Sequence, residues 1–278
     1  MGTFWEQVKA NDHAVPGDRP LDELTTELTR MLGDADPSRR EGLAYPTLAA
    51  WVSAGVYDDL LQGFGDGMAV GLGVGLGESG TDTVFRRSFS SRVLAECLLR
   101  DIDQHLLVGD AVLRWGDRIA SWFVRERDLR GFVPGKGWAN TLAHGADAIG
   151  ALAGSRAMGR PELTVLLDVV SDRLVAPTEH RLVQGEADRM SLATMTILRR
   201  DLIDVDVLEP WMARLVEQAP QTESVGTDPS SSNDNVESYL RSLHLQLALT
   251  PNPPRCRSDL LLVVIEALRK ANPNVLGS

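Results

Sequence analysis

Cysteine is scarce in this chain, with only Cys97 and Cys256 among 278 residues. Cys97 lies in an apolar helical segment and Cys256 stands between two arginines. Two cysteines so far apart make neither a disulfide framework nor a zinc cluster. We therefore expect a cytoplasmic protein in a reducing compartment, with no cofactor.

Positive charge is also in short supply, since the formal net charge is −11. A negatively charged surface repels nucleic-acid phosphate and anionic lipid. Nucleic-acid binding would need a local basic patch, which disfavours it as a general activity. The arginines available for such a patch are Arg86, Arg87, Arg125, Arg127, Arg130, Arg199 and Arg200.

Long apolar runs are missing too, because none reaches the roughly 18 residues that a membrane span requires. The first residues, Met-Gly-Thr-Phe-Trp-Glu-Gln-Val-Lys, lack the basic region and apolar run of a secretory signal. We expect a soluble intracellular protein without a membrane partner.

Apolar residues, which make up 43% of the chain, recur instead at helical spacing. One stripe comprises Leu163, Leu166, Leu167, Val170 and Leu174. No alternating strand pattern is present, so the sequence predicts an all-α protein of about ten helices in one domain, 1–278. Helices of this length joined by short turns favour antiparallel pairs stacked into an α/α superhelix of the HEAT kind. Residues 218–235 have linker composition and are predicted to form a mobile internal loop.

The most unusual segment is 125–147, which combines charge, glycine and one histidine. Lys136 is one of only three lysines. We expect a helix to begin near Trp138, so that free N–H groups around Gly135 and Gly137 form a cradle for an anion beside the Lys136 ammonium.

Arg127 or Arg130 could complete this anion site, and Trp138 is a further candidate substrate-binding residue. The alternative is that Asp128 pairs with an arginine and the glycines only permit a tight turn. A lone Gly-Lys-Gly is not a nucleotide-binding P-loop, because the spacer, the following Ser or Thr and the preceding strand are absent.

In the helix expected after this turn, Asn140, His144 and Asp147 are spaced i, i+4 and i+7, which predicts one shared face. An aspartate one turn from a histidine can orient it as a general base. The alternative is a buried histidine whose hydrogen bonds are satisfied inside the fold. Metal binding is disfavoured, because asparagine is a poor zinc ligand and further ligands are missing.

Other candidate sites are weaker. The Gly-x-Gly pairs within 63–80 lack the flanking strands of a dinucleotide site. After them, Arg86 and Arg87 are expected to be exposed, and Arg87 is a candidate substrate-binding residue. Ser88 and Ser90 lack a nucleophile elbow and are expected to be packing or surface serines. The segment 186–189 could add a second acid to the site or be a favourable first helical turn.

Three blocks of the chain resemble a bacterial family of unknown function. They are Phe85-Arg-Arg-Ser-Phe-Ser90, Arg127-Asp-Leu-Arg-Gly-Phe132 and Gly135-Lys-Gly-Trp-Ala-Asn-Thr-Leu-Ala-His-Gly-Ala-Asp147. The resemblance spans about residues 20–215 and implies no established activity. It also implies a histidine where this chain has Asn140, so any chemistry that needs two histidines is in doubt here.

Two hypotheses for the function follow. In the first, the protein is an enzyme acting on a small anionic or polar substrate without a metal: His144 is the acid/base, Asp147 and Asn140 assist it, and Lys136 and Arg130 bind negative charge. In the second, it is a noncatalytic helical-repeat protein that binds a peptide, a protein partner or a small metabolite. The sequence does not predict an oligomeric state.

Overall fold

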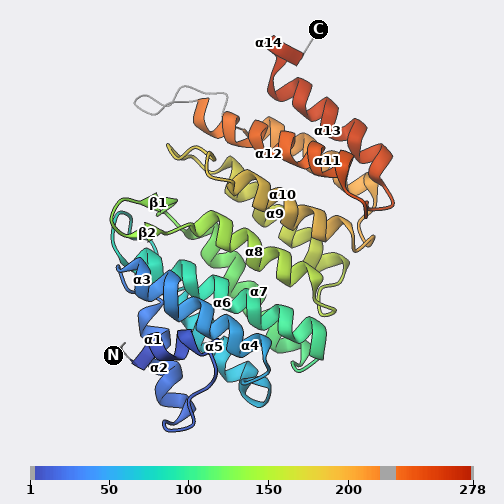
Figure 1. Ribbon diagram of the computed structural model, residues 1–278. Coiled ribbons are helices and arrows are strands. Elements are labelled where there is room, and N and C mark those ends of the chain that lie inside the picture. The colour runs from blue at the N-terminus through green and yellow to red at the C-terminus, as the bar shows by residue number, and fades with distance from the viewer. Residues whose placement is uncertain (1–3, 220–229, 277–278) are drawn as a thin grey trace. The chain divides into compact units, whose positions relative to one another are not determined.

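Helices account for nearly all regular structure in the computed structural model, which describes residues 4–219 and 230–276 (Figure 1). Within these ranges the α-helices are α1 (Phe4–Ala10), α2 (Leu21–Met31), α3 (Pro37–Arg39), α4 (Tyr45–Ser53), α5 (Leu61–Gly71), α6 (Thr83–Gln104), α7 (Gly109–Arg125), α8 (Thr141–Gly154), α9 (Arg160–Val175), α10 (Glu186–Leu198), α11 (Val205–Gln218), α12 (Ser230–Leu249), α13 (Arg257–Ala271) and α14 (Pro273–Leu276). A π-helical turn, η1 (Arg40–Ala44), and a 3-10 turn, η2 (Asp58–Leu60), complete them. The predicted all-α fold is confirmed.

The chain divides into two compact units, Met1–Ala157 and Met158–Ser278. Each unit is described by itself below. The single domain and the superhelix expected from the sequence concern the arrangement of the whole chain, and they stay predictions.

In the first unit, α4, α6 and α8 lie side by side (Figure 1). Ser88 near the start of α6 contacts His144 near the start of α8. Ile102 near the end of α6 approaches Gly154 at the end of α8. The two helices therefore run parallel. The helix that connects them in the sequence, α7, runs in the opposite direction, since Gly109 at its start approaches Ala157 and Glu126 after its end contacts Arg87. Helix pairs are stacked in this unit.

The second unit repeats this arrangement with α10 and α12. Ser191 and Ser242 share a hydrogen bond of 2.7 Å, and Arg199 donates to Thr250 at 2.9 Å. Both pairs are 51 residues apart in the chain. In the first unit the corresponding separation, between Ser88 and His144, is 56 residues. The sequence shows no clean repeat, yet parallel helices recur at a similar spacing because the packing requires similar helix lengths and not similar residues.

A small hairpin, which the sequence did not predict, interrupts the helices. Strands β1 (Phe132–Val133) and β2 (Gly137–Trp138) pair antiparallel. Gly135 and Gly137 have positive φ, 74° and 77°, which glycine adopts without steric cost. Two-residue strands are too short to show alternation, so only the turn was visible in the sequence.

The loop expected over 218–235 lies largely outside the described residues. Gln218 is the last residue of α11, and α12 begins at Ser230, so the end of the expected loop is helical. The buried Asn235 accepts from the Leu182 N–H at 2.8 Å and donates to the His180 carbonyl at 2.8 Å. These two bonds tie α12 to the backbone of the segment before α10, which the linker-like composition around Asn235 does not predict.

No helix in the described part of the chain is both long and apolar enough to cross a membrane.

Candidate functional site

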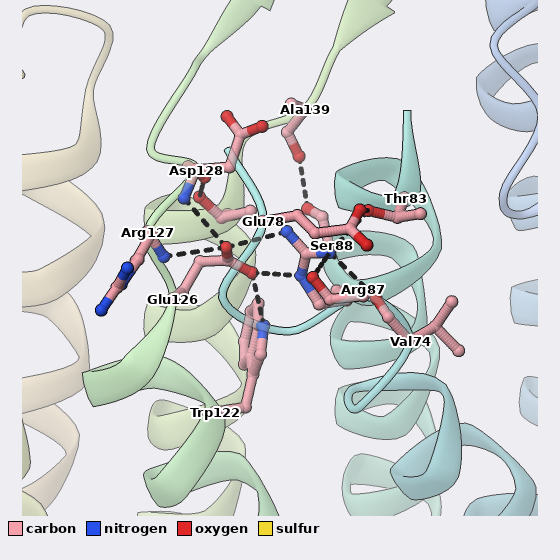
Figure 2. A network of polar contacts seen from close by, with 12 residues as sticks. Val74, Glu78, Thr83, Arg87, Ser88, Trp122, Glu126, Arg127, Asp128 and Ala139 are labelled. Atoms are coloured by element: carbon pink, nitrogen blue, oxygen red, sulfur yellow. Dashed lines mark hydrogen bonds and ion pairs between the residues drawn. The ribbon is translucent and has the colours of Figure 1, made fainter. Parts of the chain in front are cut away.

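A buried polar network surrounds Arg87 at the start of α6 (Figure 2). The Arg87 side chain is fully buried, and two of its nitrogens donate to the Glu126 carboxylate at 2.6 and 2.9 Å. The third nitrogen donates to the carbonyls of Val74 and Gly75 and to Thr83 Oγ1, at 2.9 to 3.0 Å. Arg87 thus joins α6, the loop that precedes it and the end of α7.

The prediction that Arg87 is exposed is therefore wrong. A guanidinium can be buried when a carboxylate compensates its charge and its N–H groups find acceptors. Glu126 and two loop carbonyls meet both conditions. Arg86, the neighbour expected to be exposed with it, is half-buried, and its guanidinium donates to the Thr29 carbonyl.

Glu126 follows the last residue of α7 and is as well satisfied as its partner. Besides Arg87, it accepts the Trp122 indole N–H at 2.9 Å and the backbone N–H groups of Arg127 and Asp128 at 3.0 and 2.9 Å. The two backbone bonds fix the direction in which the chain leaves α7. Glu126 therefore orders a segment that has no helical hydrogen bonds of its own.

Asp128 extends the network to the next turn. Its fully buried carboxylate accepts the Gly80 N–H at 2.9 Å and two nitrogens of Arg130 at 2.7 and 2.6 Å. Arg130 also donates to the Thr81 carbonyl at 2.7 Å. The hydrogen bond to Asp128 raises the pKa of Arg130 despite partial burial. We call Arg87, Glu126, Asp128 and Arg130 the polar clasp.

His144 lies in α8 against α6 and is 5% exposed. Its Nδ1 is 2.8 Å from Ser88 Oγ, and Ser88 Oγ also donates to the Ala139 carbonyl. Serine has one proton, and a carbonyl can only accept, so Nδ1 must be the donor to Ser88. The Phe89 ring packs edge-on against the imidazole at 5.1 Å. This arrangement matches the buried-histidine alternative.

The same bonds define the two serines considered as nucleophiles. The Ser88 hydroxyl donates a hydrogen bond to the Ala139 carbonyl and accepts one from His144. Its oxygen is therefore held between α6 and the start of α8 and is not activated by His144 as a base. Ser90 is also fully buried. Both are packing serines, as one of the sequence alternatives has it.

Lys136 and the glycines beside it are in the hairpin and not at a helix start. The prediction of a helix beginning near Trp138 is wrong, because α8 begins at Thr141. Lys136 Nζ donates to both Asp82 oxygens at 2.6 and 2.8 Å, and its N–H donates to the Val133 carbonyl at 2.9 Å. The turn therefore lacks the unpaired first-turn amides that the anion cradle required.

The hairpin is instead fixed by two residues that the sequence did not single out. The Arg40 guanidinium is fully buried, lies 3.9 Å from the centre of the Phe85 ring and donates to the Lys136 carbonyl. Glu41 accepts the Trp138 N–H at 2.7 Å. Burial lowers the pKa of Arg40, partly offset by its hydrogen bond with Glu41. No local pattern marks Arg40 as a residue that holds the hairpin, since its partners there, the Lys136 and Trp138 carbonyls, are 96 and 98 residues away.

Asn140 lies outside the regular turns of α8, as its N-cap residue, with φ 55° and ψ 35°. The expected single face of three residues is thus reduced to His144 and Asp147. Asn, Asp and His are the non-glycine residues found most often in this left-handed conformation. The left-handed backbone at this position therefore suits an asparagine.

The remaining candidates divide between unit 1 and unit 2. In unit 1, Arg127 and Trp138 are exposed and Asp147 is half-buried. In unit 2, the buried Glu186 accepts from the Gln184 N–H at 2.7 Å and lies 3.1 Å from His180 Nε2. Glu186 thus has its own partners in unit 2. Among the described residues, no group of three or more His, Cys, Asp or Glu side chains is placed to hold a metal ion.

Segment 125–147 therefore belongs to an all-α protein whose irregular connections are fixed by buried charge. The family model described as "Protein of unknown function (DUF2785)" matches residues 72–245, more than half of the chain, and the protein belongs to this family. The match includes the whole polar clasp and the hairpin. No curated protein and no solved structure matches the chain.

Proposed function

We propose that this protein is a noncatalytic helical protein that binds a peptide or protein partner, and that the hairpin is a contact point. The observation that carries the proposal is the pair of aromatic side chains on the hairpin. Phe132 is 52% exposed and Trp138 is 36% exposed. Their rings meet edge to face with centroids 5.3 Å apart.

Exposed aromatic side chains on a fixed backbone are characteristic of binding hot spots, because they add contact area at little entropic cost. Here Arg40 holds the Lys136 carbonyl, Glu41 holds the Trp138 N–H, and Lys136 pairs with Asp82. The half-buried Val133 packs on the core residues beneath. Such a hairpin presents Phe132 and Trp138 in one geometry before a partner arrives. The occupant we propose is a peptide segment that lays an apolar side chain against both rings.

The acid/base enzyme receives less support from the same residues. That mechanism needs His144 to reach a substrate and Lys136 to bind its negative charge. His144 is 5% exposed and its Nδ1–H donates a hydrogen bond to Ser88, while the Lys136 ammonium donates to the Asp82 carboxylate. These groups serve the fold in ways that leave little for catalysis.

We also propose a bacterial cytoplasm as the compartment. Both cysteines are free, and Cys97 is buried. Burial raises the pKa of the Cys97 thiol, which keeps it protonated and slow to oxidise. A reducing compartment suits a chain of this kind.

The test is site-specific photocrosslinking in the native host, with a photoreactive amino acid in place of Phe132. The matched control places it at Leu60, an apolar residue of unit 1 that is 59% exposed. A protein crosslinked from position 132 and not from position 60 is then purified and titrated against the wild type, Trp138→Ser and His144→Asn. We expect Trp138→Ser to raise Kd by about tenfold or more, as hot-spot truncations do.

His144→Asn keeps a donor close to the Nδ1 position and should bind the partner as the wild type does. The proposal fails if crosslinking from position 132 is no stronger than from position 60. It also fails if a small-molecule turnover is found that His144→Asn abolishes while Trp138→Ser leaves it unchanged.

A further inference from the structure

The six tryptophans of the chain differ in what their indole N–H groups contact. Four of these groups donate to acceptors inside the protein at 2.7 to 3.0 Å, those of Trp5, Trp51, Trp115 and Trp122. The Trp211 N–H is buried without an acceptor. Trp138 is the exposed tryptophan, at 36%, and its indole N–H has no acceptor among the described residues. The exposed ring pair of the hairpin therefore includes a hydrogen-bond donor that a ligand can use.

The ring pair also has a definite shape. The Phe132 and Trp138 rings lie at 72° to one another, with their centroids 5.3 Å apart. Two nearly perpendicular rings form a corner, in which a flat aliphatic ring can contact both of them at once. Because Glu41 holds the Trp138 N–H and Arg40 holds the Lys136 carbonyl, this corner exists before a ligand arrives.

The charges around the hairpin do not select a charged ligand. The charged side chains bonded to the hairpin form two ion pairs of 2.6 Å, Arg40 with Glu41 and Lys136 with Asp82. The exposed Arg127, in the segment before β1, and the exposed Glu78, in the loop before α6, have opposite signs. The ring pair therefore offers apolar surface and one donor, which suits an uncharged group with a hydrogen-bond acceptor.

The small size of this surface limits how flexible its ligand can be. Each peptide residue that becomes ordered on binding costs entropy, and two aromatic side chains provide little contact to offset that cost. A polyproline II segment is extended and stiff before it binds, and its backbone carbonyls make no internal hydrogen bonds. Aromatic surfaces on proteins recognise such segments for this reason. A flexible peptide of the same length would lose more entropy for the same contact.

We infer that the hairpin binds a proline-rich segment of its partner in the polyproline II conformation. A proline ring packs in the corner between Phe132 and Trp138, and a neighbouring backbone carbonyl accepts the Trp138 indole N–H. This inference rests on the proposed function and names the ligand of the same surface. It requires two separate contributions from Trp138, the ring and its N–H group, which substitutions can distinguish.

Heteronuclear NMR of the full chain tests the inference, because each indole N–H gives its own resonance and Trp138→Phe identifies that of Trp138. We expect this resonance to shift and saturate as a polyproline peptide is added. A glycine-serine peptide of the same length should leave it unmoved, as should polyglutamate and polylysine. No shift with polyproline overturns the inference, as does a shift as large with any of the other three peptides.

The affinity for a labelled polyproline peptide, measured by fluorescence anisotropy, separates the two contributions. Trp138→Phe keeps an aromatic ring and removes the donor, so we expect binding about fivefold weaker than that of the wild type. Trp138→Ser removes both and should abolish binding. Leu60→Ser is the control at an exposed apolar position of unit 1 and should bind as the wild type does. Circular dichroism checks that each variant is folded, and a Trp138→Phe variant that binds as tightly as the wild type overturns the inferred hydrogen bond.

The crosslinking experiment distinguishes failure of this inference from failure of the proposed function. A partner crosslinked from position 132 through a segment without proline would support partner binding and overturn only the proline-rich ligand. Crosslinking from position 132 that is no stronger than from position 60 would overturn both. A crosslinked segment rich in proline supports both.

Discussion

Two parallel helix pairs, one in each unit, are joined by different chemistry. Between α6 and α8, Ser88 links His144 to the Ala139 carbonyl, and the polar clasp lies next to these bonds. Between α10 and α12, the buried links are neutral hydroxyl contacts, Ser191 with Ser242 at 2.7 Å and Thr194 with Tyr239 at 2.8 Å, while the charged Asp188 and Arg199 bond to Ser242 and Thr250 in partly exposed positions. Packing two parallel helices thus does not require buried charge.

The difference lies in the connections that each unit must hold. The loop before α6 and the segment after α7 have carbonyl and N–H groups without helical partners, and a buried backbone group needs one. Arg87 supplies donors to Val74 and Gly75, and Glu126 accepts from Arg127 and Asp128. The buried charged side chains therefore provide the hydrogen bonds that this irregular backbone does not form within a helix.

The sharpest way to break this comparison is to remove one half of the buried ion pair. Arg87→Met should lower the free energy of unfolding of the first unit by about 3–5 kcal/mol, because it leaves the Glu126 charge buried without its partner. Urea unfolding followed by circular dichroism measures this. Arg241→Met, which removes a 62% exposed arginine paired with Glu237 on α12, is the control and should change stability by less than about 1 kcal/mol. Equal effects would contradict the structural role of the polar clasp.

The two serines that join the parallel helices allow a smaller and closely matched test. Ser88→Ala removes two buried hydrogen bonds, to the Ala139 carbonyl and from His144 Nδ1, which costs about 1–3 kcal/mol. Ser242→Ala should cost about 1 kcal/mol or less, because Asp188, its acceptor at 2.6 Å, is exposed and can turn to water, and Ser191 can donate to the Asp188 carbonyl at 3.0 Å in place of Ser242. Thermal unfolding of both variants measures which loses more stability. A larger loss in Ser242→Ala than in Ser88→Ala would show that the hydrogen bonds of Ser88 do not stabilise the fold as expected.

Acid should affect the second unit through Glu186. Burial alone would raise the pKa of Glu186, but the hydrogen bonds from His180 and the Gln184 N–H outweigh it and hold the pKa below its ordinary value of 4.5. A carboxylate with a lowered folded-state pKa adds stability that is complete above about pH 4.5 and is lost as the pH falls through that folded-state pKa.

Glu186→Gln should therefore reduce the fall in the urea midpoint between about pH 5 and pH 3. Glu217→Gln, at an exposed position of α11, should keep the wild-type slope. If both variants follow the wild type, Glu186 is not a source of the acid sensitivity.

The smallest expected effect is at Lys136, one of only three lysines in the chain. Its ion pair with Asp82 is 42% and 43% exposed at the two side chains, and exposed pairs contribute less than about 1 kcal/mol. Lys136→Met should therefore barely change stability, and it should leave partner binding within about twofold of the wild type. A large loss of binding would restore Lys136 as a ligand-binding residue.

The fold was the more predictable part of this protein. Apolar stripes such as Leu163 to Leu174 mark helices by themselves, because helical periodicity is local. The hairpin is less visible, since two-residue strands leave only Gly135 and Gly137 as a signal. The helix start at Thr141 was misplaced because Asn140 takes a left-handed conformation that only the surrounding structure imposes.

The candidate site was predicted as a segment, and its chemistry stays a prediction. One alternative predicted from the sequence was that Asp128 pairs with an arginine, and Asp128 does pair with Arg130, two residues away. Arg87 and Glu126 are 39 residues apart, and Ser88 and His144 are 56 apart. No local rule joins residues at such distances.

The spacing of apolar residues determined that this chain is helical. Its charge, its glycines and the rare lysine Lys136 marked 125–147 as unusual. The tertiary structure alone decided what the polar groups there contact. A buried charge takes whichever partner the packing brings within hydrogen-bond reach, and for Arg87, Arg40 and His144 that partner comes from another element of the fold. The aromatic pair of Phe132 and Trp138 likewise exists only because the hairpin closes on Arg40 and Glu41.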